Sequence, residues 1–348
     1  MDVKMSIEHF MLRELREGPI AVKSTLEKID ELTKTLVDEI EEREIEKGFI
    51  IGSGTSFHAS LILNYLLSRY TSLQFTAVPA SEFELWALSI KEKHAVIAFS
   101  QSGESSDIIK AINKARESGV FVVGITNTPG STLTKLANIS IVTRAGEEKA
   151  VAATKTHDVQ IATSYLLAFR LVKRIDLIRE LYKIPEKMDR VLDEEENIKR
   201  LAGEYRRAEH IFILGRGVNY PVSLEAALKL KETSMVHAEG FALREFLHGP
   251  IQLVNETTPI LLILPSEETL TVSKKVVDRL REYKAPLISI VSEHLNIDFT
   301  DNIIRIPSVF EDLSALLTVK AAQLFSYFTS ILRGYNPDKP TKLAKVVR

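Results

Sequence analysis

The chain alternates short, almost wholly apolar runs with longer segments whose apolar residues recur at helical spacing. The clearest run covers residues 95–99 and ends in the polar sequence SQSGESSD, residues 100–107. A helical pattern follows directly, with apolar side chains at Ile108, Ile109 and Ile112. A run of this length bounded by hydroxyl and glycine residues predicts a buried strand, and its direct passage into a helix predicts an α/β unit.

The same pattern occurs twice. Residues 49–54 (FIIGSG) match residues 212–217 (FILGRG), and both are apolar runs that end in Gly-x-Gly before a helical segment. The run at 96–99 recurs at 261–264, and the sequence ANI at 137–139 recurs as DNI at 301–303. All three matches lie about 160 residues apart, which is the sign of an internal repeat. We therefore predict two homologous α/β domains, at 46–190 and 205–330, each a mostly parallel, doubly wound sheet flanked by helices.

The remaining segments are predicted from periodicity and charge. Residues 1–45 have apolar residues at helical spacing and indicate one or two N-terminal helices. Residues 183–200 are rich in charge and contain Pro185, which favours a solvated connecting helix or linker. Residues 313–332 indicate a long amphipathic helix, and residues 331–348 a C-terminal tail that carries Lys345.

Composition narrows the functional classes. The chain is 45% hydrophobic and 26% charged with net charge −2, so nothing favours a nucleic acid or an anionic membrane as partner. The absence of cysteine excludes disulfides, thiolate metal sites and a cysteine nucleophile, and favours a cytoplasmic protein. No signal peptide, membrane-length apolar run or metal-ligand spacing is recognisable. We expect neither a metal nor another cofactor.

The loop at 100–105 is the first candidate site. Backbone N–H groups and hydroxyls at the start of a helix favour an anion. No Lys or Arg occurs in it before Lys110, which suits a phosphate monoester better than a triphosphate. A capped turn without a ligand is the alternative interpretation. The second copy has Pro265-Ser-Glu-Glu-Thr at this place, and its carboxylates would repel phosphate, so we expect one phosphate site per chain.

Glu225, Lys229 and Glu232 form the second candidate site. Their spacing places them on one face of a helix. A surface ladder of ion pairs is the alternative, but the helix is otherwise apolar and starts just after a Gly-x-Gly turn, where α/β sheets place ligands. A carboxylate beside a lysine is a plausible proton shuttle there.

Two further residues have weaker signals. His248 precedes Gly249-Pro250, a pair that restricts the backbone and could hold the imidazole in a fixed direction, although a loop histidine is more often polar surface. Lys345 lies in a tail that frays by default, yet the tail could fold over a pocket and supply an amine.

Several long motifs resemble one family. They are HFMLRELREGP, GSGTSF, SQSGESSD, AGEEKAVAATKT, LGRGVNYPVSLEAALKLKE, HAEGFALREFLHGP and LAKVVR. In this order they resemble the isomerase half of the glutamine–fructose-6-phosphate amidotransferases, which is built from two sugar-isomerase (SIS) domains. The resemblance covers nearly the whole chain. It implies a homodimer whose site binds a sugar phosphate.

The resemblance also implies residue roles. Glu232 matches the base that moves a proton between C1 and C2, and Lys229 matches its helper near the C1 oxygen. His248 matches the group that opens the sugar ring, supplied by the neighbouring subunit, and Lys345 the lysine that forms a Schiff base at C2. The positions that contact the phosphate or the sugar are Thr55, Ser56, Ser100, Gln101, Ser102, Ser105, Val151 and Ala153, and we add Glu225 from its helix face.

The chain also departs from the family pattern. Ser53 stands where the family commonly has Cys, Ala153 replaces a Ser beside the sugar, and the glutaminase half is absent. We therefore expect a glucosamine-6-phosphate deaminase that releases fructose 6-phosphate and ammonia. The alternatives are synthesis of glucosamine 6-phosphate with free ammonia or with ammonia from a separate glutaminase chain, a related phosphosugar isomerase or deglycase, and a sugar-phosphate-sensing regulator.

Overall fold

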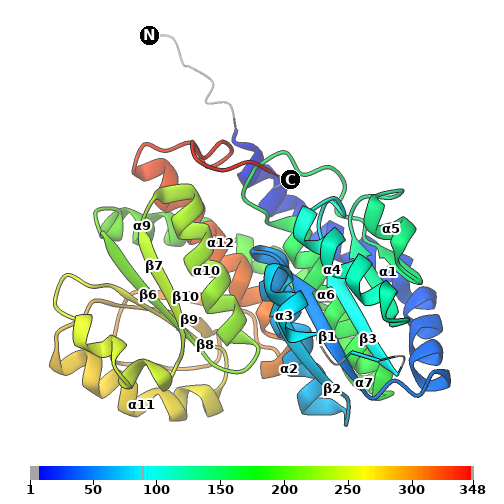
Figure 1. Cartoon of the computed structure of the whole chain (residues 1–348). Helices are drawn as coiled ribbons and strands as arrows, with labels where there is room; N and C mark the ends of the chain where they lie inside the picture. Colours follow the sequence, from blue (N-terminus) through cyan, green and yellow to red (C-terminus); the bar gives the residue numbers. More distant parts are fainter. Residues whose placement is uncertain (1–7, 88–89, 92, 346–348) are drawn as a thin grey trace.

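The computed structural model describes residues 8–87, 90–91 and 93–345. These residues form two five-stranded, all-parallel sheets with helices between and around them (Figure 1). The first sheet has the order β2-β1-β3-β4-β5 and the second, read from its other edge, β7-β6-β8-β9-β10. When the strands of each unit are counted from its own first strand, both sheets have the order 2-1-3-4-5. This shared order confirms two tandem doubly wound α/β domains. The strands are β1 Lys47–Gly52, β2 Gln74–Pro79, β3 His94–Phe99, β4 Phe121–Thr126, β5 Ile139–Val142, β6 His210–Gly215, β7 His237–Ala242, β8 Ile260–Leu264, β9 Leu287–Ser292 and β10 Ile303–Ile306.

Helices follow most strands, as the repeat predicts. In the first unit they are α2 Thr55–Tyr70, α3 Phe83–Trp86, α4 Ser106–Glu117, α5 Thr132–Leu136 and α6 Lys155–Leu171. In the second unit they are α10 Asn219–Ser234, α11 Glu267–Glu282 and α12 Ala315–Leu332. Short 3₁₀ turns cover Ala80–Glu82, Glu245–Leu247, Pro250–Leu253 and Glu311–Leu313. The predicted passage from the apolar run at 95–99 to a helix is confirmed as β3 and α4.

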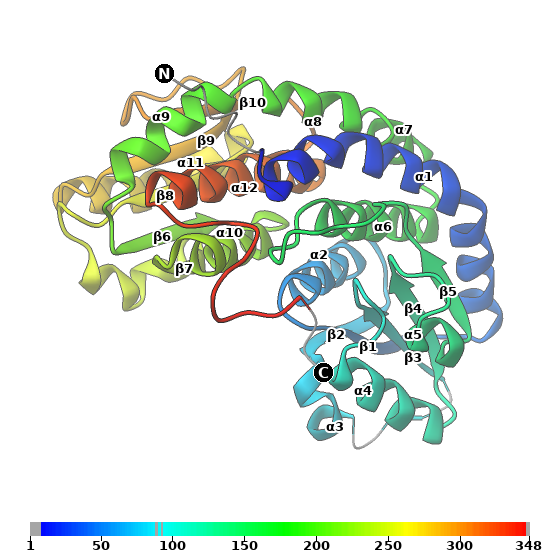
Figure 2. The same cartoon turned by 90° about the horizontal axis from the view of Figure 1, so that it is seen from above.

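The N-terminal segment forms one helix, α1 Phe10–Glu42, with Pro19 inside it. It begins beside α12, runs along α6 and α8, and passes β5 at the outer edge of the first unit (Figure 2). The helix predicted near the C-terminus is confirmed as α12. The prediction that it is amphipathic is wrong, because α12 is buried on all its faces. By length and composition α12 could cross a membrane, yet 89% of it is buried, because helices of both units pack around it. It is a core helix of this fold.

Of the prediction of a solvated connecting helix or linker at 183–200, the helix is confirmed and the solvated character is wrong. This segment forms α8 Ile184–Leu192 and α9 Glu195–Tyr205, after the short α7 Ile175–Leu181. Met188, Val191, Ile198 and Leu201 are fully buried, and both helices pack on α12. The charged residues that suggested a linker occupy only the outer faces, so the apolar stripe between them decides the packing.

One hydrophobic cluster runs continuously between the sheets, and two smaller clusters lie on their outer faces. Inside the large cluster the Lys320 ammonium lies 2.6 Å from Asp158 Oδ2, with both side chains fully buried. A Cβ on Gly18 of α1 would lie 2.5 Å from the same oxygen, so this close approach requires glycine. The ion pair therefore ties α1, α6 and α12 together.

Candidate active site

The serine loop, residues 100–105, lies between β3 and α4. Ser100 Oγ accepts a hydrogen bond from Gly103 N at 3.0 Å, and Ser102 Oγ accepts one from Glu104 N at 3.2 Å. Gly103 has φ +66°, and a Cβ there would lie 2.2 Å from Ser131 Oγ. The loop therefore folds back on itself in a conformation that only glycine fits easily.

The groups of the serine loop suit an anion. Ser105 is the N-cap residue of α4, and its hydroxyl makes no capping bond within the described chain. Glu104, the loop's carboxylate, is turned toward α5, where it accepts from Thr132 N at 2.7 Å and Thr132 Oγ1 at 2.8 Å. The loop itself therefore offers hydroxyls and amides to an anion, although the first turn of α4 also carries the Asp107 carboxylate. Gln101 contributes a backbone carbonyl that accepts from Thr126 Oγ1 at 3.1 Å and anchors the loop.

The corresponding place in the second unit is occupied by the protein itself. At the N-terminus of α11 the carboxylate of Glu311 accepts from Ser266 Oγ and from Thr269 Oγ1, the latter at 2.6 Å. In the second unit the carboxylate of Glu311 therefore already accepts the hydrogen bonds that these two hydroxyls could donate to a phosphate. This arrangement is compatible with the prediction of a single phosphate site, in the first unit.

The lysine cluster consists of Thr55, Glu225, Lys229 and Glu232. Lys229 Nζ donates to Thr55 Oγ1 at 3.0 Å, lies 3.3 Å from Glu225 Oε1 and is hydrogen-bonded to Glu232. The side chains of Glu225 and Lys229 are 0% and 1% exposed, so the alternative of a surface ladder does not apply. Glu232 is 20% exposed and is the charged member that solvent reaches most easily.

The electrostatics of this cluster keep its ions charged. Burial favours neutral Glu225, but the Lys229 ammonium outweighs it and holds the pKa of Glu225 at about 2. Burial likewise favours neutral Lys229, and the two carboxylates overcome it and raise the pKa of Lys229 above its ordinary value. The lysine is therefore a fixed positive charge rather than a base.

The lysine cluster and the serine loop lie near the same edge of the first sheet. β1 and β3 are neighbours, and their carboxyl ends lead to Thr55 at the start of α2 and to the serine loop. Ser56, next to Thr55, accepts from Gln160 Nε2 at 3.0 Å. Ligands of open α/β sheets bind at such an edge.

Sequence reasoning missed two histidines here. His58 Nδ1 lies 2.6 Å from Glu225 Oε2. The feature of the sequence that could have indicated His58 is its position one turn after Thr55 on α2. His157 is fully buried, and its two ring nitrogens have no hydrogen-bond partner among the described residues. Burial lowers the pKa of His157 to about 4, so the ring is neutral at pH 7.

The tail brings Lys345 to a third carboxylate. Lys345 Nζ lies 2.8 Å from Glu148 Oε2 and donates to the Ala150 carbonyl at 2.6 Å. Glu148 is fully buried and also accepts from Thr154 N at 2.9 Å and Thr156 Oγ1 at 2.7 Å. Burial would raise the pKa of Glu148, but the Lys345 ammonium lowers it below its ordinary value. Sequence reasoning missed Glu148, which lies within the AGEEKAVAATKT motif.

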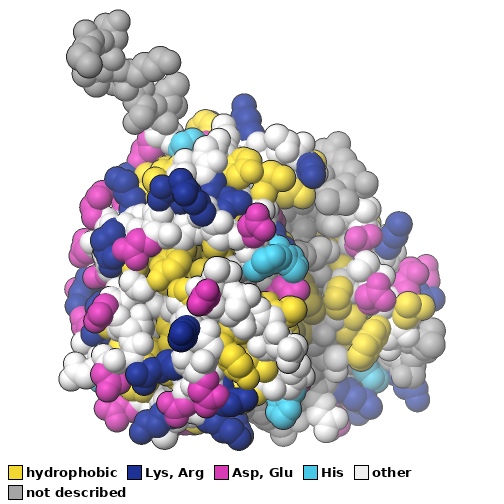
Figure 3. Space-filling model, turned by 90° about the vertical axis from the view of Figure 1, so that its left-hand side faces the viewer, with side chains coloured by type: hydrophobic (Ala, Val, Ile, Leu, Met, Phe, Trp, Pro, Cys, Tyr) yellow, Lys and Arg dark blue, Asp and Glu magenta, His cyan; other side chains and the backbone are white. Residues whose placement is uncertain are grey.

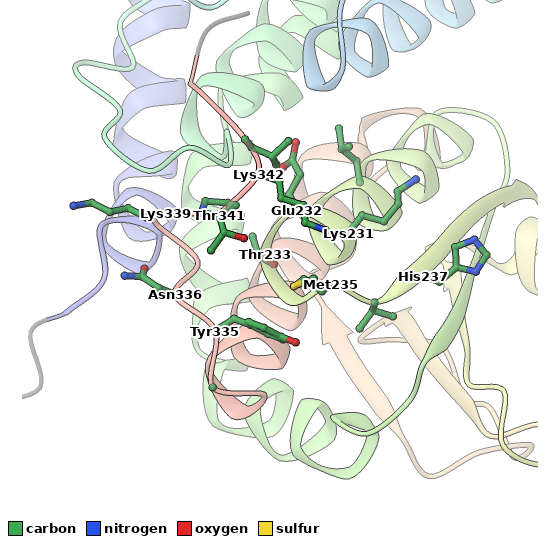
Figure 4. Close-up of a pocket in the computed structure, with 15 residues that line it drawn as sticks. Lys231, Glu232, Thr233, Met235, His237, Tyr335, Asn336, Lys339, Thr341 and Lys342 are labelled. Carbon is green, nitrogen blue, oxygen red and sulfur yellow. The ribbon is translucent and has the colours of Figure 1, made fainter.

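The same loop carries Val151 and Ala153, both half-buried. Val151 N donates to the Asp338 carbonyl at 3.2 Å, so the backbone of this loop contacts the tail. The tail then passes the C-terminal half of α10 and encloses a cavity of about 890 Å³ with it (Figure 4). Glu232, Thr341 and Lys342 line this cavity, so the tail lies beside the most exposed charged residue of the lysine cluster.

His248 is not part of this assembly within one chain. It is exposed at the turn after Leu247, and its imidazole has no hydrogen bond to the described residues of the lysine cluster. Gly249, with φ +131°, and Pro250 fix the turn. Its ring-opening role from a neighbouring subunit therefore stays a prediction.

Comparison with known proteins shows the family of the chain. The model of the SIS domain family matches residues 43–170 and 204–333. A glutamine–fructose-6-phosphate aminotransferase (isomerizing) of Aquifex aeolicus is 35% identical over 99% of this chain and 58% of its own length, and one of Corynebacterium glutamicum is 39% identical over 97% and 58%. The chain thus spans somewhat more than half of these relatives.

The fold also matches solved structures. The C-terminal domain of the glucosamine-fructose-6-phosphate aminotransferase of Francisella tularensis has a TM-score of 0.85 and 26% identity, over 97% of this chain and 100% of its own. A glucosamine-6-phosphate deaminase of Thermotoga maritima has a TM-score of 0.77 and 23% identity, over 97% and 99%. The second likeness shows the fold alone.

Proposed function

The chain belongs to the SIS domain family, and we propose that it interconverts an amino sugar phosphate and a ketose phosphate by moving a proton between C1 and C2. The buried Lys229 ammonium beside the more accessible Glu232 carboxylate carries this proposal. Such a pair can stabilise charge on a carbonyl oxygen while a carboxylate exchanges a C–H proton. The serine loop supports it with an anchor for a phosphate remote from the reacting carbons.

In the proposed deamination, glucosamine 6-phosphate and water give fructose 6-phosphate and ammonia. His248 of a neighbouring subunit opens the ring, and Glu232 takes the proton from C2 while Lys229 steadies the C1 oxygen. The resulting enolamine receives the proton at C1 and becomes an imine at C2. Lys345, after leaving Glu148 and losing a proton to solvent, adds to C2 of this imine and expels ammonia, which gives a Schiff base between Lys345 and the open ketose. Water then adds to C2 and releases the free lysine and fructose 6-phosphate. Synthesis follows the same steps in reverse, with water expelled when the Schiff base forms and ammonia displacing the lysine.

The direction depends on the ammonia supply. These 348 residues hold no cysteine and so no thiolate to release ammonia from glutamine, whereas deamination needs no ammonia source. The names of the relatives favour synthesis as the second candidate. In that case a separate glutaminase chain is the partner we propose.

We also propose a cytoplasmic homodimer that shares His248 between subunits. The exposed position of His248, outside its own chain's lysine cluster, supports this arrangement. Figure 3 shows groups of hydrophobic side chains among charged ones on one side of the molecule. Apolar side chains scattered in this way occur on most protein surfaces, so the proposal of a dimer rests on His248.

An activity screen tests the proposed function. The purified chain is incubated with glucosamine 6-phosphate, with fructose 6-phosphate plus ammonium, and with a fructosamine 6-phosphate, and ammonia and sugar phosphates are quantified. We expect ammonia and fructose 6-phosphate from the first mixture. Product from only the second mixture would favour synthesis, and product from only the third a deglycase. Tight binding without turnover would instead indicate a regulator.

A further inference from the structure

His58 of the first unit is hydrogen-bonded to Glu225 of the lysine cluster, and the steps above give it no role. Its Nδ1 lies 2.6 Å from Glu225 Oε2, and its side chain is 13% exposed while that of Glu225 is fully buried. The bond joins α2 of the first unit to α10 of the second across 167 positions of sequence. It is therefore a contact between the two halves of the candidate site.

The two oxygens of Glu225 have separate partners. Thr55 Oγ1 donates to Oε1 at 3.1 Å, and Lys229 Nζ lies 3.3 Å from the same oxygen. His58 alone, among the described residues, is hydrogen-bonded to Oε2. Because Thr55 and His58 are one turn apart on α2, they approach the carboxylate from one helix face. The orientation of Glu225 is thus set from the first unit.

The charge of Glu225 decides the tautomer of His58. An ionised carboxylate can only accept hydrogen bonds, so Nδ1 of the imidazole carries a proton and donates it. The second nitrogen, Nε2, is then free of a proton in the neutral ring. Because Glu225 accepts a hydrogen bond at each oxygen, its side chain is held in one rotamer. The Lys229 ammonium that pairs with it is thereby held in one position.

We propose that His58 is a positioning residue: by donating to Glu225 it fixes the carboxylate that aims Lys229 at Glu232 and at the substrate. The proposal rests on the proposed function for its activity readout. Removal of the Nδ1 donor would leave one oxygen of a fully buried carboxylate without a partner, which is unfavourable. Glu225 would then turn or draw Lys229 Nζ toward itself, away from Glu232. The chemical step would slow while the serine loop still bound the phosphate.

The kinetic experiment compares His58→Leu with His58→Asn, whose amide NH₂ can replace the Nδ1 donor. Exchange of the C1 proton of fructose 6-phosphate with D₂O is followed by NMR. For His58→Leu we expect kcat to fall at least about tenfold with KM within about twofold, and for His58→Asn kcat within about threefold of the parent. His294→Leu removes a histidine bonded to Ser308 Oγ, outside the cluster, and should leave both parameters unchanged.

Two results would overturn the proposal: parental kcat in His58→Leu, or a loss in His58→Asn as large as in His58→Leu. Should His58→Leu fail to fold, His58→Ala with added imidazole replaces it. Recovery of kcat by imidazole then supports the positioning role, and no recovery argues against it.

A spectroscopic measurement separates this inference from the proposed function. In ¹⁵N NMR of the parent protein we expect His58 as the Nδ1–H tautomer, and in Glu225→Gln we expect its signals to move. A His58 ring protonated at Nε2 alone in the parent would overturn the inference whether or not the protein turns over sugar phosphate. Absence of exchange with any sugar phosphate, together with the expected tautomer, would refute the proposed function only.

Discussion

Lys229 lies between two carboxylates, and this position accounts for most of the chemistry expected at the site. The ammonium is held charged by Glu225, which is itself held by Thr55 and His58. Within the described part of the chain Glu232 is hydrogen-bonded to Lys229 alone, and it borders the cavity beneath the tail. Of the two carboxylates, Glu232 is therefore the one placed to meet a substrate, and Glu225 the one placed to hold the lysine. Direct contact of Glu225 with substrate stays a prediction.

Glu232→Gln tests the base at the residue scale. Glutamine keeps the volume and an oxygen for Lys229 but cannot take a proton from carbon, so exchange between C1 and C2 should fall at least about a hundredfold. Binding of fructose 6-phosphate, measured by calorimetry, should change little. Glu239→Gln, on the exposed face of β7, is the matched control. Parental exchange in Glu232→Gln would show that another group is the base.

His157→Phe tests the buried neutral histidine. Burial lowers the pKa of His157 to about 4 in the folded protein, against an ordinary value of about 6.5 in an unfolded chain. Between these values the unfolded state binds more protons, so the free energy of unfolding decreases as the pH falls from 6.5 to 4, by up to about 3 kcal/mol. The phenylalanine variant should lose that part of the pH dependence.

Urea unfolding at pH 4 to 7 measures this effect, and His294→Phe serves as the control. The ring nitrogens of His157 have no partner to lose among the described residues, so stability at pH 7 should be similar or higher. An unchanged slope in His157→Phe would mean that other groups dominate the acid response.

At the scale of elements, the tail is held at both ends. Asp338 accepts from Phe10 N and Met11 N of α1 at 2.8 Å each, and Lys345 pairs with Glu148. The segment between them passes over the end of α10 (Figure 4). The tail thus connects the first helix, the loop at 144–154 and the lysine cluster, rather than fraying into solvent.

Lys345→Met tests the tail lysine, and the structure changes what is expected of it. Sequence reasoning alone suggests that this substitution leaves folding intact. Because Glu148 is fully buried, loss of its cation should destabilise the protein by about 1–3 kcal/mol. Lys345→Met/Glu148→Gln should recover most of this stability but not the turnover, with Glu148→Gln alone as the control. Parental turnover in the double variant would exclude Lys345 from the reaction.

At the scale of the whole molecule, the two units divide their tasks. The first unit offers a hydroxyl loop at a helix N-terminus, while the second fills its own equivalent with Glu311 and carries the lysine cluster instead. The helices α1, α6, α8, α9 and α12 bind the units together around a common core. The candidate site is therefore a product of both units.

A mixing experiment tests whether two subunits share one site. His248→Asn and Glu232→Gln should each be nearly inactive alone. In a mixed dimer one of the two sites would hold both native residues, so a fully exchanged equimolar mixture should recover about a quarter of the parental activity. Native mass spectrometry confirms the exchange. Mixed dimers without recovered activity, or a monomeric protein, would refute the shared site.

The sequence by itself determined the repeat, the four strands β1, β3, β6 and β8, the passage from β3 to α4, and the single helix face that carries Glu225, Lys229 and Glu232. These features depend on neighbours within a few turns, so periodicity and spacing reveal them. It also favoured the hydroxyl loop, because the residue types that bind an anion at a helix start lie side by side in the chain.

Only the tertiary structure decided the rest. Sequence could not show that α12 is buried all round or that α8 and α9 pack on it, because burial depends on both units closing over the same helices. Nor could it show that His58 meets Glu225 across 167 positions, or that Lys345 meets Glu148 across 197. Such pairs form when distant segments pack together. A buried charge is unfavourable unless it has a partner, and the residues next to it in the sequence do not show which distant residue that partner is.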